Sequence, residues 1–197
     1  MATLEFWYEF ASTYSYLTVM RIEEQAQAAG VEIEWRPFLL GPIFKSQGWD
    51  TSPFNLFPAK GRYMVRDIER IAAARGLPFR MPPTFPVNGL NAARLALLGV
   101  SAGWCPAFTR SVFAAQFQRG EDISQPEVLV GILAELGVDP AQATAAACSN
   151  ANKQALRLQT EIAMQRGIFG APSFITSDGE LFWGDDRLEQ ALAWARR

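Results

Sequence analysis

The chain has 197 residues, 49% of them hydrophobic, and its 18 basic and 20 acidic residues give a net charge of -2. This size predicts one globular domain, or a domain with a large insertion, and so balanced a charge without a Lys/Arg cluster argues against a nucleic-acid partner. The sequence has no histidine and only two cysteines, which excludes Ser-His-Asp and Cys-His catalysis and an ordinary zinc site.

The chain also lacks the patterns of a secreted or membrane protein. No basic segment followed by an apolar stretch opens the sequence, and the longest uncharged run, residues 95–109, contains two glycines and a proline. A membrane-spanning helix needs about 20 predominantly apolar residues. We therefore expect a cytoplasmic protein without a membrane partner. Cys105 and Cys148 follow no redox spacing and are predicted to be structural.

The first 40 residues predict a β-α-β unit. Apolar and polar residues alternate over residues 4–10, which is typical of a strand. Ser12 or Thr13 then caps a helix that is expected to continue to residue 29, where Gly30 ends it. Alternation returns over residues 31–39 and predicts a second strand, parallel to the first.

The rest of the chain is mostly helical. Residues 41–58 lose all periodicity and predict a functional loop, and helical patterns then continue, with interruptions, to Gly167. Two short strands, residues 173–176 and 180–183, predict a hairpin because Ser, Asp and Gly separate them. A last helix follows.

This order of elements, β-α-β, a helical block and α-β-β-α, predicts an α/β protein of the thioredoxin-like fold with a large all-helical insertion after the second strand. Residues 1–40 and 151–197 would form the thioredoxin-like domain, and residues 41–150 the insertion. In that fold the first strand-to-helix junction carries the C-x-x-C site. Here the junction reads Ser12-Thr13-Tyr14-Ser15, which excludes thiol exchange by these residues.

Two segments are candidates for binding a thiol-containing peptide. Ser12 places a hydroxyl at the start of a helix, where an anion is stabilised; the alternative is a simple N-cap. Ala171-Pro172 lies between a glycine and a strand, where a cis peptide would present a backbone edge to an extended ligand. A trans proline at a strand start is the alternative.

The remaining candidates are polar or aromatic side chains outside these two segments. Asp185 and Asp186 begin the last helix and would meet the ammonium group of a zwitterionic ligand, or only favour the helix dipole. Lys60 would reach a ligand carboxylate, unless it is a solvated surface charge. Asn88 would orient an oxygenated substrate or cap a helix, and Trp49 would wall an aromatic site. No metal site is expected.

Four segments together resemble a known family. Residues 10–17, 58–64, 169–174 and 183–188 are similar, in order and spacing, to the 2-hydroxychromene-2-carboxylate isomerases, which are relatives of kappa-class glutathione transferases in the DsbA-like thioredoxin group. The resemblance spans essentially the whole chain. Tyr63, in the second segment, joins Trp49 and Asn88 as a predicted contact of an aromatic substrate.

The resemblance implies glutathione as the cofactor. By carry-over, Ser12 hydrogen-bonds the glutathione thiol and Ala171, before Pro172, pairs its backbone with the cysteinyl unit. Asp185 and Asp186 match the segment that binds the γ-glutamyl end, and Lys60 matches a lysine that reaches glutathione. Relatives are often dimers, so a homodimer is expected. The chain departs from the family in Thr13, where proline is usual, in Asp185, where asparagine is frequent, and in the loop of residues 48–55.

The implied reaction interconverts 2-hydroxychromene-2-carboxylate and trans-o-hydroxybenzylidenepyruvate in naphthalene-type aromatic breakdown, through reversible addition of the glutathione thiolate. Because the loop of residues 48–55 helps to shape the acceptor pocket, a related aromatic intermediate is also a candidate substrate. Two alternatives stay open: a kappa-like glutathione transferase that conjugates electrophiles, and a non-catalytic binder of thiols or peptides.

Overall fold

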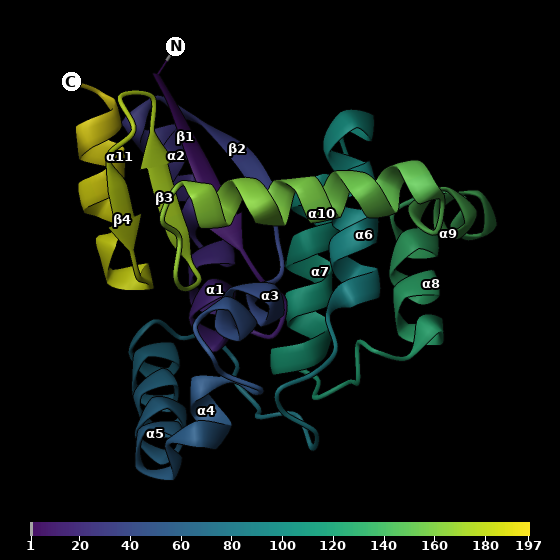
Figure 1. The fold of residues 1–197 in the computed structure, drawn as a ribbon, viewed down its shortest axis with the longest axis horizontal. Coiled ribbons are helices and arrows are strands. Elements are labelled where there is room, and N and C mark those ends of the chain that lie inside the picture. Colours follow the sequence, from purple (N-terminus) through teal and green to yellow (C-terminus); the bar gives the residue numbers. More distant parts are fainter. Residues whose placement is uncertain (1) are drawn as a thin grey trace.

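The computed structural model describes residues 2–197, and its strands build one four-stranded sheet (Figure 1). The strands are β1 (Ala2–Tyr8), β2 (Val31–Pro37), β3 (Ser173–Thr176) and β4 (Leu181–Trp183). Their order is β2-β1-β3-β4, with β1 parallel to β2 and antiparallel to β3, and β3 antiparallel to β4. The predicted parallel pair and hairpin are confirmed, and the architecture is a thioredoxin-like α/β fold with helices between β2 and β3.

The helices before and after the sheet strands follow the expected order. They are α1 (Thr13–Val19), α2 (Ile22–Ala29), α3 (Leu40–Ser46), α4 (Pro53–Leu56), α5 (Pro58–Ala74), α6 (Leu90–Ala102), α7 (Cys105–Phe117), α8 (Pro126–Glu135), α9 (Pro140–Ala147), α10 (Asn150–Gln165) and α11 (Leu188–Ala195), with a 3-10 turn η1 (Asp185–Arg187) before α11.

The prediction of one continuous helix up to residue 29 was wrong, because α1 ends at Val19 and α2 begins at Ile22. Arg21, between them, has φ -137° and ψ -14°, outside the helical region. Its side chain reaches across to Asp185 and Glu189 near the other end of the chain. No Gly or Pro marks this break, so the local sequence did not indicate it.

The predicted loop of residues 41–58 also contains more structure than expected, namely the short helices α3 and α4. Leu40 and Ile43 of α3 are buried against Trp7 and Phe38. Helices of four to seven residues complete barely two turns, so they show no periodicity that a sequence pattern can reveal.

Strand β1 lies inside the sheet and is buried on both faces. Leu4, Phe6 and Tyr8 point into the main core, whereas Trp7 packs on the opposite face in a second cluster with Phe38. A strand covered on both sides by helices reads as nearly continuous apolar sequence. Whatever follows β1 therefore emerges between packed elements and not at an open surface.

The helices of the insertion form two groups (Figure 1). α4 and α5 pack on each other below the sheet, whereas α6, α7, α8 and α9 contact one another on the far side from α11. α10 contacts α6 and α9 as well as β2 and α3, so it bridges the insertion and the sheet. The domain boundaries at residues 40 and 151 stay a prediction. Among residues 2–197, no helix has the length and apolar content to span a membrane.

Candidate functional site

A cavity of about 630 Å³ opens beside the junction between β1 and α1. Its wall is mainly apolar and comes from four parts of the chain: the junction itself, the segment around α3 and α4, the connection before α6, and the loop before β3. Residues from all four parts meet there, and α5 and β4 each add one side chain: Ser12, Thr13, Tyr14, Phe44, Trp49, Phe54, Phe85, Asn88, Phe169 and Ala171, with Met64 from α5 and Trp183 from β4. The tertiary fold thus gathers segments more than 150 residues apart around the predicted thiol site.

Ser12 lies at the edge of this cavity and makes two hydrogen bonds. Its Oγ accepts from the Ser15 N–H at 3.1 Å and donates to the carbonyl of Ala171 at 2.9 Å. The capping alternative is therefore confirmed, and the same hydroxyl also faces the proline loop. Because a hydroxyl has two acceptor sites and one proton, Ser12 retains one acceptor site, and it donates to a ligand only by turning away from Ala171.

The proline loop that faces Ser12 contains the Ala171-Pro172 peptide, which is cis. Gly170 precedes it, and a Cβ at this position would lie 2.4 Å from Nε1 of Trp183. Only glycine allows the indole to approach the loop so closely. Trp183 also packs against Phe169, with ring centroids 4.9 Å apart, and both rings are about half exposed. These two rings form the aromatic rim of the cavity.

Thr13 supplies a second hydroxyl beside Ser12. The residue is 2% exposed, and its Oγ1 has no hydrogen-bond partner among the described residues. Buried hydroxyls are normally paired, so an orphaned one at a cavity wall is consistent with a polar ligand atom as its partner. No cluster of three potential metal ligands is present in residues 2–197.

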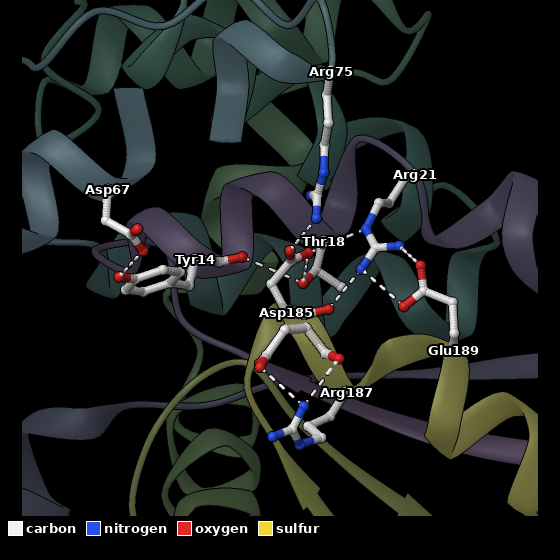
Figure 2. A network of polar contacts seen from close by, with 9 residues as sticks. Tyr14, Thr18, Arg21, Asp67, Arg75, Asp185, Arg187 and Glu189 are labelled. Atoms are coloured by element: carbon white, nitrogen blue, oxygen red, sulfur yellow. Dashed lines mark hydrogen bonds and ion pairs between the residues drawn. The ribbon is translucent and has the colours of Figure 1, made fainter. Parts of the chain in front are cut away.

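Behind the junction, Asp185 is held in an ion cluster (Figure 2). The carboxylate is 3% exposed. Its Oδ1 accepts from Thr18 Oγ1 at 3.0 Å and from Arg21 Nε at 3.2 Å, and its Oδ2 accepts from Arg75 Nη2 at 2.6 Å. These partners come from α1, from the α1–α2 break and from the end of α5. Asp185 therefore joins three elements and uses its charge within the protein.

The neighbouring Asp186 has a different environment. Its side chain is 73% exposed and its nearest cation is Arg187, at 3.0 Å. On the other side of the same region, the Tyr14 hydroxyl donates to Asp67 of α5 at 2.9 Å (Figure 2). Tyr14 and Arg75 thus give α5 two polar connections to the rest of the fold.

Comparison with known proteins identifies the family. A model of the DSBA-like thioredoxin domain matches residues 3–193. The chain is 31% identical over 189 residues to a 2-hydroxychromene-2-carboxylate isomerase of Sphingobium xenophagum, covering 95% of this chain and 94% of that one. The protein belongs to the 2-hydroxychromene-2-carboxylate isomerase family of DSBA-like thioredoxin domains.

Two further matches agree with this family. Glutathione S-transferase kappa 1 of Homo sapiens is 26% identical over 200 residues, which cover 95% of this chain and 88% of that one. A solved structure of a 2-hydroxychromene-2-carboxylate isomerase superposes with a TM-score of 0.88 at 26% identity, covering 99% of this chain and 95% of that one. The relationship to both isomerases and kappa transferases holds over nearly the whole chain.

Of the predicted site residues, Ser12, Ala171, Trp49 and Asn88 line the cavity. Trp49 packs with Phe44 at 5.8 Å between ring centroids. Asn88 Oδ1 accepts from the N–H of Leu90 at 3.0 Å, but the N-cap of α6 is Gly89, so Asn88 bonds the first turn of α6 from one residue before the cap while it lines the cavity. These four residues stay in the proposed site.

Lys60 and Tyr63 do not line the cavity. Gly61 and Ile68 are the buried positions of this part of α5, and Met64 lies between them on the same face and reaches the cavity. Lys60 and Tyr63 fall outside this face, since side chains three, four and seven residues apart share one side of a helix. Lys60 Nζ lies 4.8 Å from the centre of the Phe57 ring, and Tyr63 is 62% exposed.

Pro172 and the acidic pair lie near the cavity without lining it. Pro172 is buried, and its carbonyl accepts from the Gly184 N–H at 3.0 Å, which attaches the loop to the start of η1. Asp185 is buried and paired with Arg21 and Arg75, and its contact with the ligand's ammonium group stays a prediction. Asp186 is the acidic residue of the pair that is exposed.

The sequence interpretation missed Glu9, which lines the cavity three residues before Ser12. We expected it on the polar face of an alternating strand, but β1 is covered on both faces and Glu9 is only 9% exposed. Burial raises the pKa of the Glu9 carboxyl to about 7, partly offset by a hydrogen bond from the Ala11 backbone. The only signal in the sequence was an acidic residue next to the junction.

Proposed function

We propose that the protein is a glutathione-dependent isomerase that acts on 2-hydroxychromene-2-carboxylate or a related intermediate of aromatic degradation. The observation that carries this proposal is the pairing of Ser12 with Ala171 at the edge of an aromatic cavity, in a chain of the isomerase family. A hydroxyl at the position of the redox cysteine favours binding of a thiol over disulfide chemistry.

The residues of the cavity fit glutathione in their chemistry. Ser12 has a proton to donate to a sulfur, and Thr13 Oγ1 is unpaired among the described residues. The Ala171 carbonyl, once released by Ser12, accepts a backbone N–H of an extended peptide. Outside the cavity wall, Asp186 is exposed and offers a carboxylate to an ammonium group. When bound, glutathione would supply a thiolate that adds reversibly to a conjugated substrate and frees its double bond for rotation.

The protein itself positions the substrate and stabilises the glutathione thiolate. Ser12 favours the thiolate because a hydrogen bond to a charged group contributes about 1.5 to 3 kcal/mol. Trp49 and Phe44 hold the aromatic ring of the substrate, and Asn88 orients its oxygen atoms. The rim formed by Phe169 and Trp183 limits access of water to the reacting atoms.

Glutathione affinity and chromene isomerisation, measured for wild type and Ser12→Ala, test this proposal. We expect glutathione binding to weaken by about tenfold or more in Ser12→Ala, because about 1.4 kcal/mol corresponds to a factor of ten. Ser15→Ala is the matched control, since the Ser15 hydroxyl is buried without a partner among the described residues. Equal rates in wild type and Ser12→Ala would overturn the mechanism.

One observation favours a second candidate, a kappa-like transferase. The described residues that line the cavity include Glu9 and Asp50 but neither Lys nor Arg. Such a wall suits an uncharged aromatic electrophile better than a carboxylate. Product analysis separates the two functions, because conjugation consumes glutathione in proportion to product whereas isomerisation leaves its concentration unchanged.

A further inference from the structure

Glu9 is a buried acidic group of the cavity to which neither proposed function gives a role. It follows the end of β1, and its backbone carbonyl accepts from the Ser12 N–H at 3.0 Å. This turn fixes Glu9 and Ser12 together at one edge of the cavity, and both residues line it. A carboxyl that is 9% exposed in such a place is either a structural group or a reacting one.

The packing around the Glu9 carboxyl leaves space for this group. A Cβ on Gly89, in the connection before α6, would lie 3.3 Å from Glu9 Oε1 and 3.0 Å from the Cβ of Phe10. A larger residue at position 89 would press on the carboxyl and on the strand end. Glycine at this position therefore keeps room between β1 and the connection, on the cavity side.

Nothing in the described residues neutralises Glu9. No Lys or Arg lines the cavity, and Glu9 is in none of the ion pairs among residues 2–197. The other titratable groups on the wall are Tyr14 of α1 and Asp50 of the loop between α3 and α4. The Tyr14 hydroxyl already donates to Asp67, and burial raises its pKa, so Tyr14 stays protonated.

This environment makes Glu9 able to exchange a proton at neutral pH. Removal from water disfavours the charged form and raises the pKa of the carboxyl to about 7. An acid or base is most effective when its pKa lies near the working pH, since both forms are then populated. A carboxyl kept only for structure would be expected to have a cation beside it, as Asp185 has.

We propose that Glu9 is the proton-transferring catalytic residue for the opening of the hydroxychromene ring, an inference that rests on the proposed isomerase function. The Glu9 carboxylate takes the proton of the hydroxyl on C2. The bond between C2 and the ring oxygen then breaks, its electron pair goes to the ring oxygen, and C2 becomes a ketone carbon. Glu9 returns the proton to that oxygen, which becomes a phenol, and the carboxylate is regenerated.

The first test measures the protonation of Glu9 directly, in the absence of substrate. Infrared difference spectra of wild type against Glu9→Gln report the carbonyl stretch of a protonated carboxyl. We expect this band at about pH 6 and its loss by about pH 8, in keeping with a neutral carboxyl at the cavity wall. If the band is already lost when the pH has risen to about 5, as for an ordinary exposed glutamate, the proposal is overturned.

The second test measures kinetics. We expect kcat for the chromene to fall by about 100-fold or more in Glu9→Gln, because general acid-base catalysis contributes about 10² to 10⁴. Glutathione affinity should change by less than about twofold, since Glu9 has no assigned contact with the thiol or the peptide. The dependence of kcat on pH near neutrality should disappear in this variant and be retained in Glu9→Asp.

A control variant and two contradicting outcomes separate the role of Glu9 from the proposed isomerase function. Glu127→Gln removes an exposed carboxylate on α8, outside the cavity, and should leave both constants unchanged. A Glu9→Gln enzyme with wild-type kcat and an unchanged pH profile would overturn the proton-transfer role while leaving the isomerase intact. A wild-type protein that binds no glutathione and opens no chromene would overturn the proposed function and this role together.

Discussion

Two buried carboxyls near the same junction have opposite environments. Asp185 is 3% exposed and meets Arg21, Arg75 and Thr18, whereas Glu9 is 9% exposed and has no cation beside it among the described residues. Burying a carboxylate is costly unless it is paired. Asp185 is therefore paired and joins three elements, whereas burial of the unpaired Glu9 raises its pKa to about 7. Burial alone therefore does not distinguish an architectural carboxyl from a reactive one.

The largest expected effect is on the free energy of unfolding, and it tests Asp185, the paired carboxyl. Replacing Asp185→Asn leaves Arg21 and Arg75 without their shared carboxylate, and we expect a loss of about 3 kcal/mol in the free energy of unfolding. Urea unfolding followed by circular dichroism measures it. Asp186→Asn is the matched control, because its side chain is 73% exposed, and it should change stability by less than about 0.5 kcal/mol. Equal losses in both variants would remove the distinction between the two aspartates.

The next effect concerns the dependence of stability on pH, and it tests Glu9. The pKa of Glu9 is about 7 in the folded protein, above the value of about 4.3 for a glutamate in an unfolded chain. Between these values the folded state holds more protons, so stability falls as the pH rises from about 4 to about 7. We expect Glu9→Gln to be more stable than wild type by roughly 3 kcal/mol at about pH 8, with no gain at about pH 4.

Urea unfolding of both proteins at several pH values checks this prediction. If Glu9 is the unpaired carboxyl, the gain in the free energy of unfolding from Glu9→Gln must increase as the pH rises. If the difference in the free energy of unfolding between the two proteins stays constant across this pH range, Glu9 is ionised in the folded protein. It then belongs with Asp185 as an architectural group.

The smallest expected effect tests the other polar connection of α5. Tyr14→Phe removes the hydroxyl that donates to Asp67 at 2.9 Å and leaves the ring in place. We expect a loss of about 1 kcal/mol, the usual contribution of a hydrogen bond, because Asp67 also pairs with Arg70 and is partly exposed. Thermal or urea unfolding measures it. A loss as large as that of Asp185→Asn would mean that the attachment of α5 depends on Tyr14 and not on the ion cluster.

Much of the fold could be predicted from the sequence because its signals are local. Alternation in β1 and β2, the turn between β3 and β4 and the glycine at residue 30 each report on neighbouring residues only. The break between α1 and α2 and the short helices α3 and α4 could not be predicted in this way. The break has no helix-breaking residue, α3 is formed by packing against Trp7 and Phe38, and α4 packs on α5.

The same distinction between local signals and tertiary packing applies to the candidate site. The serine at the junction, the Ala171-Pro172 pair before a strand and the lack of histidine can all be read from the sequence. The neighbours that each side chain meets depend on how distant segments pack. Adjacent aspartates separate, one into an ion cluster and one into solvent, because Arg21 and Arg75 arrive from segments more than 100 residues away. Glu9 lines the cavity together with distant residues such as Gly89 and Ala171, and such contacts leave no pattern in neighbouring residues.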